Sequence, residues 1–76
     1  MKRLTNIEKE LVRIGAAMGS NCVACIEHHI PQARKAGLDD EQIKLAINIA
    51  KAVKKVPADM VFQAAVDKLK KPENLE

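Results

Sequence analysis

The sequence predicts an all-α protein: one small domain over residues 1–76 with about four helices. Oligomerisation is expected to complete the hydrophobic core of this domain. Of the 76 residues, 47% are hydrophobic but only 1% are aromatic. Small strand-rich domains usually draw on aromatic and β-branched residues, whereas abundant Ala, Lys, Glu and Leu favour helices. Apolar residues also recur at the spacing of amphipathic helices, which supports the same fold class.

The first helix is expected from Thr5 to about Met18. Thr5 and Glu8 have the spacing of a capping box, in which each side chain satisfies a free backbone N–H of the other residue. An apolar stripe follows, and Gly19 is expected to end the helix. The stripe consists of Leu4, Ile7, Leu11, Ile14 and Met18.

The second helix is expected over residues 22–36, with Ser20 or Asn21 as its N-cap. Gly37 follows it, in the position where a glycine commonly ends a helix. Pro31 lies inside this range. Proline removes one backbone hydrogen bond and its ring clashes with the preceding turn, so we expect a kink there.

A third helix is expected from Asp39, which has capping-box spacing to Gln42, to about Lys55. Its apolar residues cover well over half of the helix circumference, so it should be buried on more than one side. In a chain this short we expect part of that cover to come from another subunit. The apolar residues are Ile43, Leu45, Ala46, Ile47, Ile49, Ala50, Ala52 and Val53.

Pro57 fits the first turn of a fourth helix, which Pro72 should end before frayed residues 73–76. Its apolar stripe comprises Val61, Phe62, Ala65, Val66 and Leu69. Three lysines in the last turns of the expected third helix are predicted to form a solvated face. They are Lys51, Lys54 and Lys55.

Charge and composition argue against several classes of protein. The net charge is +3 and 30% of the residues are charged, alongside a high apolar content that argues against disorder. No apolar run of about 18 residues could span a membrane, and no apolar segment of a secretory signal follows the basic start. No aromatic–basic pattern supports nucleic-acid binding. We therefore expect a cytoplasmic protein, in which two cysteines are typical of catalysis, redox chemistry or metal binding.

The segment from Cys22 to His29 holds a C-x-x-C pair followed by two histidines. Both thiols fall at the start of the expected second helix, where free N–H groups and the helix dipole stabilise the nucleophilic thiolate. His29 lies one turn after Cys25, on the same face of the helix, whereas His28 does not. The pattern predicts His29 as a base or proton relay, and His28 at the surface or an interface.

Glu10 is the candidate to orient that base. It lies at the edge of the first apolar stripe, between Ile7 and Ile14, where a half-buried carboxylate needs a partner. If the first two helices form an antiparallel hairpin, Glu10 and His29 can meet directly or through water.

Glu10, Cys22, Cys25 and His29 together form the pattern E-x11-C-x2-C-x3-H. This pattern resembles the signature of the alkylhydroperoxidase D-like branch of the carboxymuconolactone decarboxylase family. The resemblance extends over residues 5–53. One departure is Ala24, because the better-known peroxidases of the family carry a histidine directly before the second cysteine.

The resemblance implies that Cys25 attacks the substrate and passes through a sulfenic acid, and that Cys22 resolves it as a disulfide. It implies that His29 relays a proton and that Glu10 orients or shares it. The substrate would be a hydroperoxide or a disulfide, and an external thiol protein would supply electrons. The family is all-α and assembles as trimers or hexamers. No cofactor and no metal are expected.

Three other readings of the same residues stay open. The cysteine pair could switch assembly or docking in a redox-sensing oligomer without turnover. The chain could be a cofactor-free decarboxylase on the same fold, which would leave the cysteines without a role. The four residues could instead bind zinc, although structural zinc usually draws its ligands from two separate knuckles.

Overall fold

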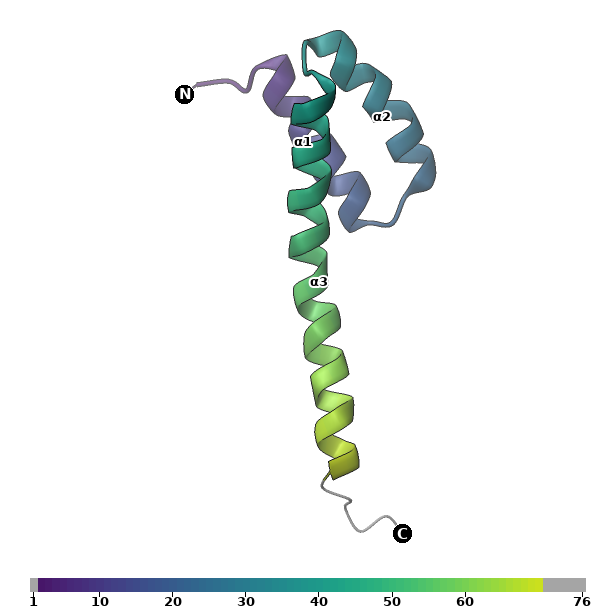
Figure 1. Ribbon diagram of the computed structural model, residues 1–76. Helices are drawn as coiled ribbons and strands as arrows, with labels where there is room; N and C mark the ends of the chain where they lie inside the picture. The colour runs from purple at the N-terminus through teal and green to yellow at the C-terminus, as the bar shows by residue number, and fades with distance from the viewer. Residues whose placement is uncertain (1, 71–76) are drawn as a thin grey trace.

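The computed structural model describes residues 2–70, and three helices account for most of them (Figure 1). Helix α1 spans Asn6–Gly19, α2 spans Val23–Ala36 and α3 spans Asp40–Lys70. Short caps and loops make up the other described residues, and no strand occurs among them. The prediction of an all-α fold is confirmed.

Local sequence signals set three of the helix ends. Thr5 N donates to Glu8 Oε1 at 2.7 Å, and Glu8 N donates to Thr5 Oγ1 at 3.1 Å. Before α3, Asp39 N donates to Gln42 Oε1 at 3.0 Å, and Gln42 N donates to Asp39 Oδ1 at 2.8 Å. Gly37 ends α2 with a φ of 114°, a left-handed conformation that favours glycine. Both capping boxes and the glycine stop are as predicted.

Helices α1 and α2 form the expected antiparallel hairpin, and the first half of α3 lies across it (Figure 1). The core lies where the three helices meet. Ile14 of α1 and Ala33 of α2 are completely buried, next to Leu38 and Ile43. The side chains that are partly buried against this core are Met18, Ile30, Ala46 and Ile47.

The expected third and fourth helices are one continuous helix, with Pro57 inside it. The physical reason lies in the residues on either side. Only Val56 separates the two expected helices, whereas connections between helices usually need at least about two residues. The neighbouring lysines and Ala58 are good helix formers, so the bond lost at Pro57 does not end the helix. Helix α2 likewise runs through Pro31.

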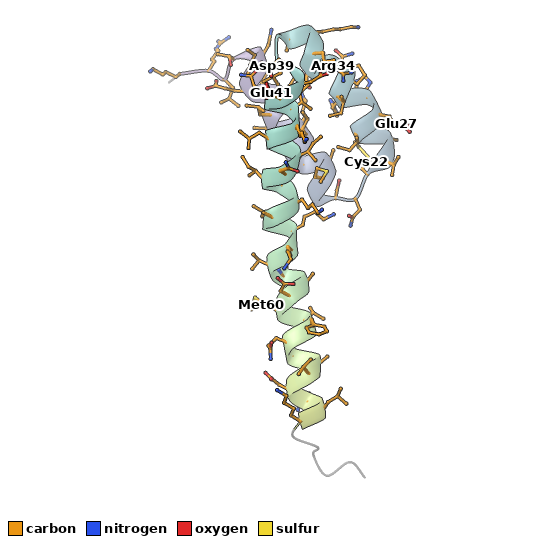
Figure 2. The ribbon with its side chains drawn as sticks, in the orientation of Figure 1. Cys22, Glu27, Arg34, Asp39, Glu41 and Met60 are labelled. Carbon is orange, nitrogen blue, oxygen red and sulfur yellow. A yellow bond between two sulfur atoms is a disulfide. The ribbon has the colours of Figure 1, made fainter. Side chains whose placement is uncertain are left out.

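The second half of α3 extends well beyond the hairpin, and Met60 marks this part (Figure 2). Residues 55–70 are exposed apart from Val66, which is half-buried. The expected end at Pro72 and the tail 73–76 lie outside the described residues. Although α3 has 31 residues, no described helix is apolar enough over a sufficient length to cross a membrane.

In a single chain, α3 is not buried on more than one side. Ile43 is its one buried residue among those described, while Leu45, Ile49 and Val53 are between 56% and 66% exposed. A hairpin of two short helices can cover only one side of so long a helix. Cover from another subunit therefore stays a prediction.

Candidate active site

The cysteine pair lies where α1 leads into α2: Cys22 is the last of three connecting residues, and Cys25 lies in the first turn of α2. Ser20 caps the end of α1, Asn21 adopts the left-handed conformation with a φ of 56°, and Cys22 caps α2. The prediction of Ser20 or Asn21 as the N-cap is wrong. An N-cap needs an extended backbone, which Asn21 lacks, and the Ser20 hydroxyl donates back to the Ala17 carbonyl at 3.3 Å.

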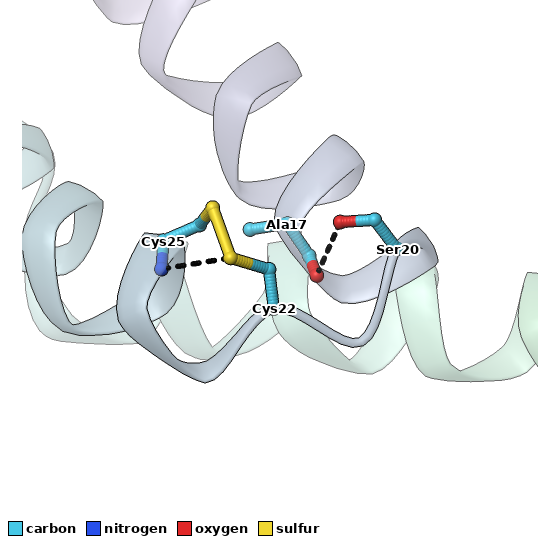
Figure 3. The surroundings of a disulfide bond; sticks show 4 residues. All are labelled: Ala17, Ser20, Cys22 and Cys25. Carbon is cyan, nitrogen blue, oxygen red and sulfur yellow. Dashed lines mark hydrogen bonds between the residues drawn. A yellow bond between two sulfur atoms is a disulfide. The ribbon is translucent and has the colours of Figure 1, made fainter.

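Cys22 and Cys25 form a disulfide at the N-terminus of α2, with their Cα atoms 5.2 Å apart (Figure 3). Cys22 Sγ also accepts a hydrogen bond from the Cys25 backbone N–H at 3.2 Å. Both residues are half-buried. The same backbone N–H can stabilise negative charge on Cys22 once the disulfide opens, because a helix N-terminus favours anions.

Glu10 and His29 face each other between α1 and α2. Glu10 is 7% exposed, which excludes an ordinary surface carboxylate. Its Oε1 lies 3.5 Å from His29 Nδ1, and neither atom has a hydrogen-bond partner among the described residues. A closer approach of the two helices by a few tenths of an ångström, with hydrogen on Nδ1, would make this contact a hydrogen bond. His28 is exposed, as expected, with its ring centroid 4.8 Å from that of His29.

A shallow pocket of about 160 Å³ joins the cysteine pair to the histidine. Its lining includes Cys25, His29 and Arg13, together with Ala16, Ala17 and Ser20. Cys25 and His29 thus border the same space, as their spacing on one helix predicts. The pocket opens to solvent and is large enough for a small substrate group and water.

Arg13 is the site residue that sequence reasoning missed. Its Nη1 donates to Glu10 Oε2 at 2.6 Å, so each carboxylate oxygen of Glu10 faces a different cation or potential cation. The i, i+3 spacing of Glu10 and Arg13 on one helix was a signal that could have found this pair.

The opposite side of the disulfide borders an apolar pocket of about 300 Å³. Its lining includes Cys22, Asn21 and Lys54, together with Ala17, Met18, Val23 and Ile26. Lys54 of α3 donates a hydrogen bond from Nζ to Asn21 Oδ1 and is half-buried. The prediction that Lys54 lies on a solvated face is therefore wrong. Its neighbours Lys51 and Lys55 are exposed. This contact ties α3 to the residue before Cys22.

Within the described part of the chain, no group of three Cys, His, Asp or Glu residues is arranged to hold a metal ion. Comparison with curated proteins and with solved structures gives no match for this chain. The model of the carboxymuconolactone decarboxylase family matches residues 2–68. The match includes all three helices almost to the end of α3. The chain therefore belongs to the carboxymuconolactone decarboxylase family.

Proposed function

We propose that this chain is a thiol-dependent oxidoreductase of the alkylhydroperoxidase D-like branch of its family, and that it reduces hydroperoxides or disulfides. The observation that carries the proposal is the Cys22–Cys25 disulfide at a helix N-terminus, beside a pocket that Cys25 shares with His29. The buried Glu10 carboxylate behind His29 supports a proton relay. A nucleophile beside an oriented base is the usual arrangement for an activated thiol.

The oxidative half-reaction starts from the reduced pair. The Cys25 thiolate attacks one peroxide oxygen, so an S–O bond forms, the O–O bond breaks, and the alkoxide leaves with a proton as the alcohol. His29 takes the proton of the Cys25 thiol before the attack and returns it to the alkoxide, directly or through water. The Cys22 thiol then attacks the Cys25 sulfenic acid, which forms the disulfide and releases water.

The reductive half-reaction returns two electrons and two protons to the pair. A dithiol protein attacks the disulfide as a thiolate and forms a mixed disulfide with one cysteine of the pair. Its second thiol then resolves the mixed disulfide and leaves both cysteines reduced. Without this external reductant the pair reacts once and stops.

We further propose that the working unit is a homo-oligomer, a trimer or a hexamer. Large apolar side chains along α3 support this, because they are exposed in a single chain; Val53, Val56, Met60, Val61, Phe62 and Leu69 are all at least 58% exposed. An apolar hollow of about 400 Å³ between α1 and α3 adds to that surface. Such an extent of exposed apolar surface is typical of subunit interfaces.

Single-turnover thiol oxidation tests the proposal. Reduced protein is mixed with one equivalent of a hydroperoxide, the remaining thiols are trapped, and the intact mass is followed over time. We expect rapid loss of two hydrogens from the wild type and no disulfide in Cys25→Ser. Oxidation no faster than that of free cysteine would reject peroxide reduction. Repeated turnover with a dithiol reductant separates an enzyme from a stoichiometric redox sensor.

The decarboxylase alternative has its own control. Activity of that kind needs no thiol, so it would survive in the double variant Cys22→Ser/Cys25→Ser. Peroxide or disulfide reduction would be lost in the same variant.

A further inference from the structure

Arg13 and His29 contact the same carboxylate from two helices. Arg13 Nη1 donates to Glu10 Oε2 at 2.6 Å, while His29 Nδ1 lies 3.5 Å from Glu10 Oε1. Arg13 also lines the pocket that holds Cys25 and His29. Arg13 is therefore coupled through Glu10 to the proposed proton relay at His29, although Arg13 is not one of the four residues of the E-x11-C-x2-C-x3-H pattern.

Arg13 holds the buried carboxylate of Glu10 in one orientation. A buried carboxylate is costly unless a cation or hydrogen-bond donors compensate its charge. The guanidinium supplies a short charge-assisted hydrogen bond at Oε2, and such bonds hold a carboxylate in one orientation. Oε1 is then left as the acceptor that points at His29.

We infer that Arg13 is a positioning residue that sets which nitrogen of His29 carries the proton. An ionised Glu10 facing Nδ1 favours the ring form with hydrogen on Nδ1, because a carboxylate accepts and cannot donate. Nε2 is then the acceptor nitrogen, free to take a proton on the side of the pocket. Only the use made of that proton rests on the proposed function; the position of the proton does not.

Two other ionisable side chains flank the pair. His28 lies edge-on to the ring of His29, and Lys35 of α2 lines a cavity with Glu10 on the side away from Cys25. Neither has a hydrogen bond to Glu10 among the described residues, whereas Arg13 has one. Arg13 is therefore the cation that determines the orientation of this carboxylate.

The ring nitrogens of His29 give a direct test that needs no activity. Two-dimensional ¹⁵N spectra of the imidazoles distinguish hydrogen on Nδ1 from hydrogen on Nε2, and His28→Gln assigns the signals. At a pH where the ring is neutral, we expect hydrogen on Nδ1 in the wild type and in Arg13→Lys. Arg13→Gln should shift the ring to a mixture of forms, as should Glu10→Gln. Lys9→Gln, which removes an exposed positive charge beside Glu10 on α1, should change nothing.

A double-mutant cycle then tests the path through Glu10. Arg13→Gln should slow oxidation of Cys25 by about tenfold, a part of the effect that a positioned general acid–base group contributes. In a Glu10→Gln background the same change should cost less than about twofold, because residues acting through one another are not additive. The inference would be overturned if the ¹⁵N signals of His29 in Arg13→Gln were those of the wild type. It would also be overturned if the rate losses of Arg13→Gln and Glu10→Gln multiplied in the double variant. If the protein does not react with peroxide, the proposed function fails, but the ¹⁵N spectra still test the effect of Arg13 on His29.

Discussion

Glu10 on α1 and His29 on α2 face each other across the helix hairpin, with Oε1 and Nδ1 3.5 Å apart. The two residues are distant in sequence and meet because α1 and α2 run antiparallel. Both atoms are buried and have no other partner among the described residues. In the proposed reaction, this pair relays the proton of the Cys25 thiol to the leaving group.

Replacing Glu10 by Gln tests the negative charge while keeping the shape of the side chain. We expect about a 10²-fold slower reaction of Cys25 with hydroperoxide, because general acid–base groups contribute about that much or more. The measurement is the rate of thiol loss by rapid mixing, with circular dichroism to show that the helices persist. Glu27→Gln removes an exposed carboxylate from α2 and should react at the wild-type rate. Equal rates for both variants would remove Glu10 from the mechanism.

The two adjacent histidines provide a matched pair of variants. His29 is half-buried and lines the Cys25 pocket, whereas His28 is exposed. His29→Gln should slow single-turnover oxidation at neutral pH by about 10²-fold, as expected for loss of a relay. His28→Gln should leave that rate within about twofold of the wild type, a change too small to indicate a role in proton transfer. A larger loss in His28→Gln than in His29→Gln would reverse the assignment.

Asn21 holds the connection to Cys22 in a conformation that few residues adopt. Its φ is 56°, and a residue with a Cβ pays about 1–2 kcal/mol there, less for Asn and nothing for Gly. Asn21→Ala should therefore lower the free energy of unfolding by about 1 kcal/mol relative to Asn21→Gly. Urea unfolding of the oxidised protein measures the difference.

The Lys54 contact contributes separately to that connection. Lys54→Met removes the hydrogen bond to Asn21 Oδ1 and leaves the backbone conformation allowed. Hydrogen bonds contribute about 0.5–1.5 kcal/mol, and this one is exposed, so Lys54→Met should destabilise by no more than that. Lys51→Met is the control, because Lys51 is exposed on the same helix.

The Asn21 prediction has its own contradicting outcome. If Asn21→Ala and Asn21→Gly have the same free energy of unfolding, the left-handed conformation does not govern the stability of the loop.

The projecting half of α3 predicts the state of assembly. Sedimentation velocity should give a mass several times the 8.4 kDa of one chain. Phe62 is 69% exposed in the single chain, so Phe62→Glu should leave an isolated chain folded but break an apolar interface. Gln63→Glu, which adds the same charge on the next residue, should keep the assembly. A wild-type mass of one chain would contradict the proposed oligomer.

Sequence reasoning worked best where interactions are local. The two capping boxes and the glycine after α2 are set by residues within one turn of each other, so their spacing is sufficient to predict them. Reasoning from local signals failed at Pro57, where a proline typical of a helix start lies within one long helix. A proline alone does not end a helix when the residues around it are helix formers and leave no room for a loop.

The sequence by itself determined the helical fold, the pairing partners Cys22 and Cys25, and the face of α2 that carries His29. Tertiary structure decided which residues of α1 and α3 meet that face. It placed Arg13 on the second oxygen of Glu10 and Lys54 on the residue before Cys22. The reason is physical: periodicity fixes directions around one helix, but the approach between helices depends on how the core around Ile14 and Ala33 packs.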